Sequence, residues 1–312
     1  MKLRSFRAFP RFLALVSLIA LSRPTLAQQL GHYIGGFTGL ENGSSPPPGL
    51  YAAAFGLVQP IDSIRGPRGN TVLKPDINVG GAIAAYSVTT EKKFLGAEYG
   101  LAFMVPVLNT RFNSNLFDAT AESAGLSDIL FMPINLGWTK AKANYTVNYS
   151  FYAPTGNFDP NSALNPGLGF WEHQIQAGLT YNIDKKKLWN TSGLTTWEIN
   201  HSKLGTNLKT GPIFTGEYSF GRRFFKYQMN AGVVGYASQK LSPDSGLPPL
   251  LSGYLDRSFG AGGEWKYTNI KHKLAFDVRY QQQFGVQLRT SGQVLIFSIT
   301  FLNMLPPPAP AK

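Results

Sequence analysis

Apolar and polar residues alternate with a period of two along most of the chain. In the segment 171–183, one face is apolar: Trp171, Ile175, Ala177, Leu179, Tyr181 and Ile183. The opposite face is polar: Glu172, Gln174, Gln176, Thr180 and Asn182. Successive side chains of a β-strand point to opposite faces, so this pattern predicts strands with one apolar and one polar face. The 3.6-residue period of an amphipathic helix is absent.

Twelve segments with this pattern follow one another after residue 49. They are 50–59, 76–89, 94–107, 128–139, 141–153, 171–183, 188–200, 211–221, 224–238, 256–267, 270–284 and 291–302. Their mean length of about 13 residues is more than twice that of strands in soluble proteins. It suits a tilted strand that crosses a membrane, which needs ~9–11 residues plus its ends.

The connections between these segments alternate between short and long. Short turns on one side and long loops on the other are typical of outer-membrane barrels, and an even strand number returns both termini to the turn side. A soluble β-sandwich or lipocalin is the alternative, but its dry core could not satisfy so many polar side chains. We therefore predict an all-β fold, a transmembrane antiparallel β-barrel of about 12 strands, with long extracellular loops and short periplasmic turns. The barrel must be closed, because lipid offers no partner for unpaired backbone groups.

The first residues are typical of a secretory signal peptide. Basic residues precede an apolar stretch from Phe12 to Leu21, and the small-residue site Thr25–Leu26–Ala27 follows. A short membrane anchor is the alternative, but ten apolar residues cannot cross a hydrocarbon core ~30 Å thick. We predict a signal peptide over 1–27, and hence export to the cell outer membrane of a Gram-negative bacterium.

The composition divides the rest of the chain into three segments. The segment 28–49 is rich in glycine and proline, and it either folds into the lumen as a plug or stays loose below the barrel. The barrel itself is predicted over 50–303. The Pro-rich tail 304–312 cannot be strand and is predicted to be disordered.

Composition narrows the chemistry. Charged residues make up only 15% of the 312 residues, there are four histidines, and cysteine is absent. This excludes a disulfide scaffold, an iron–sulfur cluster, a cysteine-type zinc site and a thiol nucleophile. We expect no metal and no cofactor. The net charge of +12 includes the basic signal peptide, so it does not indicate a nucleic-acid partner.

If the apolar faces meet lipid, the opposite residues point into the lumen. The charged lumen candidates are Glu98, Lys142, Glu172, Glu198, Glu217, Lys226, Glu264, Lys266, Asp277 and Arg279. Such charges either pair to fill the lumen or set a selective constriction. Four loop residues are candidates for a solute-access site: Asp128, Phe158, Phe170 and Tyr254. Asp128 lies where a loop re-enters the barrel, where a carboxylate caps turn amides or contacts a ligand.

Several short runs resemble a known family. They are Pro46-Pro47-Pro48-Gly49-Leu50-Tyr51, Gly125-Leu126-Ser127-Asp128, Tyr152-Ala153-Pro154-Thr155-Gly156-Asn157-Phe158, Asn165-Pro166-Gly167, Val234-Gly235-Tyr236 and Asp244-Ser245-Gly246. In order and spacing they resemble the outer-membrane proteins associated with the meta-cleavage pathway of phenol degradation. The resemblance spans about residues 31 to 303. It implies a barrel that passes aromatic or other hydrophobic compounds, and it carries over no catalytic residues.

The function predicted from the sequence is an outer-membrane, porin-like channel for aromatic compound uptake, by passive diffusion through a charged lumen. Its expected partners are outer-membrane lipid and lipopolysaccharide, a small hydrophobic solute and the barrel-assembly machinery. The alternatives are a structural or adhesive barrel that acts through its loops and an outer-membrane enzyme. A barrel phospholipase would need a Ser–His pair on the lipid-facing surface. His173 falls on that face, but the neighbouring segments place no serine beside it, so we predict that the protein is not an enzyme.

Overall fold

The computed structural model describes residues 30–114, 119–162, 164–247 and 253–303. The predicted signal peptide and the predicted Pro-rich tail lie outside these residues. The strands are β1 (Gly49–Arg65), β2 (Thr71–Leu73), β3 (Asp76–Phe94), β4 (Ala97–Ser114), β5 (Ala119–Leu126), β6 (Ile129–Thr139), β7 (Ala143–Ala153), β8 (Glu172–Asn182), β9 (Trp189–Asn200), β10 (Ile213–Phe224), β11 (Met229–Lys240), β12 (Arg257–Asn269), β13 (Leu274–Gln287) and β14 (Thr290–Phe301). Within the described residues, no helix is long and apolar enough to cross a membrane.

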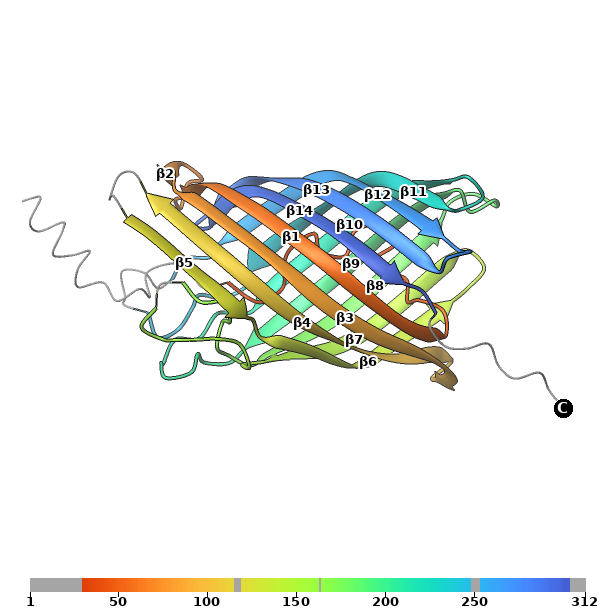
Figure 1. Ribbon diagram of the computed structural model, residues 1–312, viewed down its shortest axis with the longest axis horizontal. Helices are drawn as coiled ribbons and strands as arrows, with labels where there is room; N and C mark the ends of the chain where they lie inside the picture. The colour runs from red at the N-terminus through yellow and green to blue at the C-terminus, as the bar shows by residue number, and fades with distance from the viewer. Residues whose placement is uncertain (1–29, 115–118, 163, 248–252, 304–312) are drawn as a thin grey trace, which may run out of the picture.

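Twelve of these strands form a closed antiparallel barrel, which confirms the predicted fold (Figure 1). Each strand of the ring pairs with the next ring strand along the sequence. The strands β2 and β5 lie outside the ring and extend it at one end, where β2 pairs with β1 and β5 pairs with β4. The ring closes where β1 pairs with β14, from Ala52 opposite Phe301 to Ile64 opposite Thr290. Closure leaves no strand edge of the ring unpaired, as lipid requires.

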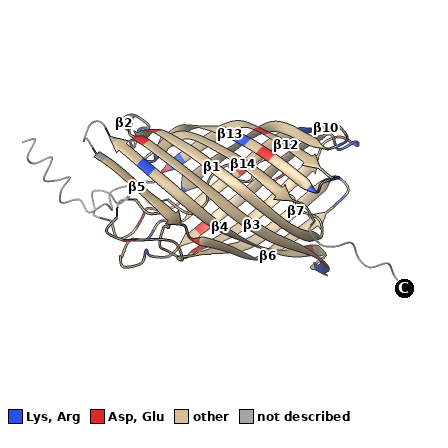
Figure 2. Cartoon of the chain, in the orientation of Figure 1, with Lys and Arg blue, Asp and Glu red and all other residues tan. Residues whose placement is uncertain are grey.

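The strand faces are inverted relative to a soluble protein. In β8 the side chain of Ile175 is 48% exposed, whereas that of its neighbour Gln174 is 1% exposed. The outward residues of β8 are apolar and the inward residues are polar, as the sequence pattern predicts. Figure 2 shows that charged residues are sparse over the outer wall and gather toward its two ends. The band between these ends is the surface that fits a hydrocarbon layer.

The strands extend further on the long-loop side than the apolar alternation predicts. The regions 60–75 and 108–127 are expected as loops, but β1 continues to Arg65, and β4 and β5 form a hairpin up to Ser114. Beyond the lipid, backbone pairing no longer needs an apolar outer face, so the hydropathy pattern fades before the strand ends. Cross-strand polar pairs take over there, as between Arg111 and Glu122 at 3.0 Å.

Three of the short turns are also displaced from their expected positions. The turn expected at 90–93 lies at Leu95–Gly96, where both residues are left-handed, with φ of 53° and 75°. The turn expected at 222–223 lies at Phe225–Tyr227, and all three of its residues have positive φ. The turn expected at 268–269 lies at 270–273. Turns of this kind favour glycine or asparagine, so bulky residues there hide the turn from a reading of the sequence.

Candidate functional site

Residues 30–48, here called the N-terminal segment, lie inside the barrel (Figure 1, red). The segment begins beside Asp128 and Glu172 at the long-loop end. It ends where Gly49 opens β1 at the short-turn end. It therefore runs along the lumen, and its own backbone groups must find partners on the inner wall.

Four carboxylates of the wall accept hydrogen bonds from successive backbone N–H groups of the segment; we call them the carboxylate ladder. Glu172 of β8 accepts from His32 at 2.8 Å, and Glu198 of β9 accepts from Tyr33 at 3.1 Å. Glu217 of β10 accepts from Gly36 at 2.8 Å, and Glu264 of β12 accepts from Leu40 at 2.7 Å. All four carboxylates are buried. The irregular segment thus finds carboxyl oxygens of the wall as hydrogen-bond acceptors in place of water.

Glu217 is the most heavily used member of the carboxylate ladder. Besides the Gly36 amide, it accepts from the Tyr33 hydroxyl at 2.7 Å and from the Thr38 amide at 3.2 Å. The Thr38 hydroxyl donates to the same carboxylate. A buried carboxylate with four donors holds the segment firmly, because removing it would take a hydrogen-bond partner from each of them.

Glycines let the segment lie this close to the wall. A Cβ at Gly39, whose φ is +68°, would overlap the Glu264 carboxylate and the Arg279 guanidinium. A Cβ at Gly43 would overlap the backbone of Leu179 in β8. At these two positions any side chain would push the segment off the wall.

Basic groups complete the contacts on this side. Arg279 of β13 donates to Glu264 at 2.7 Å and to the backbone oxygen of Gly36 at 3.1 Å. Arg223 of β10 donates to Glu41 of the segment, with 2.9 Å from Nε to Oε1. The Phe37 backbone oxygen also accepts from Arg279, so the segment is held through its amides, two of its carbonyls and one of its own carboxylates.

His32 forms a latch at the long-loop end. Its Nδ1 lies 2.9 Å from Glu172 and its Nε2 lies 2.8 Å from Asp128. Its ring stacks on Tyr152 with the centroids 4.4 Å apart, and Phe170 meets its edge. Burial alone would lower the pKa of His32, but the negative charges of Glu172 and Asp128 outweigh it and raise the pKa to about 9. His32 is therefore protonated at neutral pH and bridges two carboxylates.

Asp128 joins this latch to the loop between β7 and β8. Its carboxylate accepts from the backbone N–H groups of Gly156 at 2.9 Å, Leu168 at 2.7 Å and Gly169 at 3.0 Å. The same side chain thus caps the loop and holds His32. The N-terminal segment and the longest loop between two barrel strands are fixed by one buried acid.

The structure brings together six of the predicted lumen residues. Glu172, Glu198, Glu217 and Glu264 form the carboxylate ladder, and Asp277 and Arg279 are buried beside its last member. Lys266 lines a cavity, described below, and Glu98 is half-buried near the short-turn end of β4.

Two predicted lumen residues are placed differently. Lys142 and Lys226 are exposed in short turns, between β6 and β7 and between β10 and β11. The prediction that they point inward is wrong because β7 begins at Ala143 and not at residue 141, and because the turn before β11 lies at Phe225–Tyr227. A residue counted along a strand then falls outside it.

The loop candidates also differ in their surroundings. Phe170 is fully buried against His32, whereas Tyr254 is 47% exposed. Phe158 is half-buried, and the Lys203 ammonium lies 5.8 Å from its ring centroid and 5.7 Å from that of Phe170. Phe158 and Phe170 therefore share one cation at the closed, long-loop end of the lumen.

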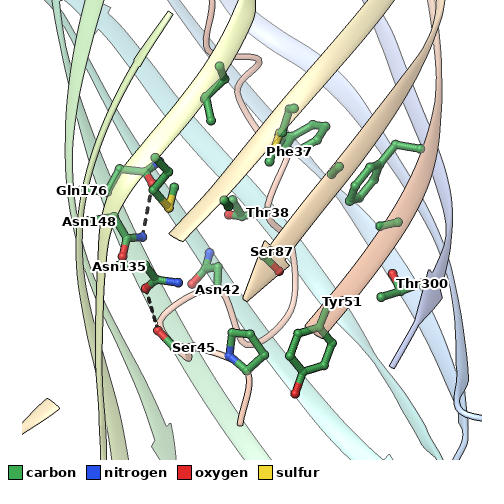
Figure 3. A pocket seen from close by; sticks show the side chains of 18 of the residues that line it. Phe37, Thr38, Asn42, Ser45, Tyr51, Ser87, Asn135, Asn148, Gln176 and Thr300 are labelled. Atoms are coloured by element: carbon green, nitrogen blue, oxygen red, sulfur yellow. Dashed lines mark hydrogen bonds between the residues drawn. The ribbon is translucent and has the colours of Figure 1, made fainter. Parts of the chain in front are cut away.

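A cavity of about 650 Å³ lies between the N-terminal segment and the barrel wall (Figure 3). Most of its wall residues belong to β14, β1, β3, β4, β6 and β7, and a few belong to β8, β9, β12 and β13. Its apolar lining includes Phe37, Phe55, Met104 and Met132. Uncharged polar groups are interspersed among them: Ser87, Asn135, Asn148, Gln176 and Thr300. The volume and the mixed lining are those of a site for a small organic molecule.

Sequence reasoning missed several residues of this site: His32, Tyr33, Glu41, Asn42 and Arg223. Two signals could have indicated them. The inward positions of the strands carry more acids than bases, which leaves acceptors in need of donors. The preceding segment carries glycines at 31, 35, 36, 39 and 43, as close approach of backbone to a wall requires.

Two further observations concern metal ligands and the outer surface. They contain no group of three or more His, Asp or Glu side chains that could hold a metal ion. On the outer surface, His173 meets the Tyr149 hydroxyl at 2.8 Å and the ring of His201 at a centroid distance of 5.2 Å. Its hydrogen-bond partner is thus a tyrosine and not the serine that a barrel phospholipase would need.

The closed antiparallel ring defines a transmembrane β-barrel of the outer-membrane type, and a solved structure shares this fold. The COG4313 outer membrane channel from Pseudomonas putida F1 superimposes with a TM-score of 0.73 and 11% identity, over 84% of this chain and 98% of that one. The β domain of the Bordetella autotransporter BrkA gives a TM-score of 0.49 and 9% identity, over 81% of this chain and 98% of that one. At such identities the likeness concerns the fold.

The sequence itself matches a family described as putative MetA-pathway of phenol degradation, over residues 62–299. The chain belongs to this family, as its short motifs predict. No curated protein sequence gives a significant match.

Proposed function

We propose that the protein is an outer-membrane channel for small hydrophobic or aromatic compounds, which cross by passive diffusion. The observation that carries this proposal is the cavity of about 650 Å³, lined by aromatic, methionine and uncharged polar side chains inside a closed barrel. Membership of the family described by phenol degradation supports the aromatic class of solute. The COG4313 channel, with the same fold, supports transport rather than catalysis.

The proposal also includes the export of the protein and its contacts in the outer membrane. The signal peptide directs the chain across the inner membrane, and the barrel-assembly machinery inserts it. The apolar outer wall then contacts outer-membrane lipid and lipopolysaccharide. Phe158, Phe170 and Asp128 form the access site at the long-loop end, because they lie around the latch that closes the lumen there.

Uptake of a labelled small aromatic compound into intact cells tests the proposal, with and without the gene and at low external concentration. Intact cells are necessary because bare lipid vesicles leak aromatic compounds. Faster uptake with the gene is expected. Equal uptake at every concentration would overturn the transport proposal, and binding of whole cells to a surface would then test the adhesive alternative.

A further inference from the structure

Lys266 of β12 lines the cavity, and its ammonium makes no ion pair or hydrogen bond with any described residue. The side chain is half-buried, and the ammonium is not one of the enclosed polar atoms of the described residues, so a molecule in the cavity can reach it. An ammonium group is a strongly hydrated point charge, and a half-buried one without a partner is short of hydrogen-bond acceptors. An anionic group of a ligand would supply them.

We propose that Lys266 binds the carboxylate of an amphipathic monocarboxylate, whose hydrocarbon body occupies the apolar part of the cavity. This inference rests on the proposed function and adds to it a charged class of solute and the residue that recognises it. The Lys266 ammonium donates to the carboxylate oxygens. The hydroxyl of Thr268, which also lines the cavity, is a further donor.

The register of the sheet places these donors at one corner of the cavity. Lys266 and Thr268 are two residues apart on one strand, so their side chains point to the same face roughly 7 Å apart. Thr268 pairs with Ala275 of β13, and Ala275 pairs with Thr300 of β14, which lines the cavity as well. This corner lies at the short-turn end of the barrel, where β12 ends at Asn269.

The acids next to Lys266 are engaged by arginines. Glu41 of the N-terminal segment feels the positive charges of both Lys266 and Arg223, but its ion pair is with Arg223. Asp277 lies opposite Lys266 in the sheet, and its carboxyl oxygen lies 3.2 Å from the Arg279 guanidinium. Neither acid is left as a dedicated partner for the lysine.

Asp277 is also hydrogen-bonded to Glu264, the other acid on Arg279. Two carboxyl groups joined by a hydrogen bond share one proton, so this pair and Arg279 together carry no net charge. Around Lys266 there remain one negative group, Glu41, and two positive groups. A bound carboxylate would balance the second positive charge.

The opposite end of the cavity has the opposite sign. There the single positive charge of His32 lies between two carboxylates, Asp128 and Glu172. Repulsion from that end and attraction to Lys266 would orient a monocarboxylate with its charge toward the short turns. Its apolar body would then point inward along the lumen.

The inward part of the cavity suits such a body. Phe37 of the segment and Phe55 of β1 lie with their ring centroids 5.2 Å apart, and both line the cavity. Met104 and Met132 line it from β4 and β6. Thioether and aromatic side chains adapt to hydrocarbon surfaces of different shapes.

The test compares 4-fluorobenzoate with 4-fluorobenzamide, its neutral isostere, by ¹⁹F NMR titration of the purified full-length barrel in a non-ionic detergent. Empty micelles of the same detergent correct for partitioning. The variant Lys266→Met removes the charge at similar length, and Lys266→Arg retains the charge. Lys226→Met is the matched control, because Lys226 is exposed in a short turn outside the lumen.

We expect Lys266→Met to weaken 4-fluorobenzoate binding roughly tenfold, which is the scale of a hydrogen bond to a charged group. Lys266→Arg should retain most of the binding, and Lys226→Met all of it. Binding of 4-fluorobenzamide should be weaker than that of 4-fluorobenzoate in the wild type and unchanged in every variant. If Lys266→Met does not fold, Lys266→Gln takes its place.

Four results would overturn the proposal. They are equal binding of the two ligands by the wild type, unchanged 4-fluorobenzoate binding without the lysine, equal weakening of both ligands in that variant, and equal weakening by Lys226→Met. The third result would report a displaced segment and not a lost ion pair.

Uptake by intact cells separates this failure from that of the proposed function. If the gene speeds the uptake of fluorobenzene and of 4-fluorobenzoate, and Lys266→Met does so equally, transport stands and the recognition role falls. If the gene speeds the uptake of neither solute while the purified barrel binds 4-fluorobenzoate through Lys266, the channel is refuted and the binding site stands.

Discussion

The two halves of the lumen wall perform different tasks. The half formed by β8 to β13 carries the carboxylate ladder and Arg279, and it is covered by the N-terminal segment. The half formed by β14, β1, β3, β4, β6 and β7 carries aliphatic, methionine and uncharged polar side chains, and it borders the cavity. Glu98 is the one predicted lumen charge on a strand of this second half.

This difference shows that the charges of a lumen need not face the solute. The acids of the first half bind the chain's own backbone, and the cavity borders mainly the second half together with one side of the segment. The charged groups of its lining are His32, Glu41 and Lys266. A channel with many inward carboxylates is thus compatible with a weakly polar cargo. Each prediction below tests this division of labour.

Removing the segment should abolish the difference between the two halves. Deletion of residues 31–45 leaves the carboxylate ladder open to water, so that ions gain a path through a twelve-strand ring. We expect single-channel conductance in planar bilayers to rise by roughly tenfold or more, because lumen width grows with strand number. A conductance equal to that of the wild type would contradict the placement of the segment as the main obstruction.

Weakening the carboxylate ladder should loosen the segment without removing it. Glu217→Ala takes a hydrogen-bond partner from four donors, and a hydrogen bond is worth ~0.5–1.5 kcal/mol. We expect frequent transient openings in the same bilayer recordings. Glu98→Ala is the matched control, since it removes an acid from the second half, and it should leave the recordings unchanged. Equal behaviour of both variants would refute the role of the carboxylate ladder.

The latch should respond to pH. The pKa of His32 is raised to about 9, so its contribution to closure is complete below its ordinary value of 6.5 and is lost as the pH rises through about 9. A difference of this size corresponds to about 3 kcal/mol. We expect openings to increase between pH 8 and pH 10.

The contribution of Asp128 to the latch has the opposite pH dependence, because it is lost in acid and not in alkali. Burial would raise the pKa of Asp128, but hydrogen bonds from His32 and Gly156 prevail and lower it. Its contribution is therefore present above the ordinary carboxyl pKa and is lost only as the pH falls below that value. His32→Gln should remove the alkaline transition, and a transition that survives in this variant would assign it to another group.

The smallest effect is expected at the turn lysines. Lys142 and Lys226 are exposed at the short-turn end, outside the lumen. Their replacement by alanine should change ion selectivity only slightly, in a manner suppressed by ~0.15 M salt. Reversal potentials under a salt gradient measure this. A large shift in reversal potential that persists at high salt would show that these lysines lie on the permeation path.

The barrel was predictable because lipid imposes a strict rule on every strand that crosses it. Alternation in the segment 171–183 is enough to predict β8 and to assign its two faces. This rule does not apply beyond the lipid. Alternation therefore did not predict the hairpin of β4 and β5 or the exact turns at Leu95 and Phe225. The displaced turns are what misplaced Lys142 and Lys226.

The site was predictable only in part. The inward acids followed from the alternation, but their partners lie more than 130 residues away in a segment without periodicity. No local pattern reports which backbone amides a carboxylate will meet. Glu41 likewise meets Arg223, which lies more than 180 residues away along the chain.

The pairing of β1 with β14 bears on how this molecule is assembled. These strands are separated by most of the chain, and such distant contacts form late because loop closure costs entropy. The strands β8 to β13, which carry the acids, pair only with their neighbours in sequence, so their pairing does not depend on this closure. The N-terminal segment can settle on that sheet and remain there when the seam shuts. The order of folding events would then spare the chain from threading nineteen residues through a finished ring.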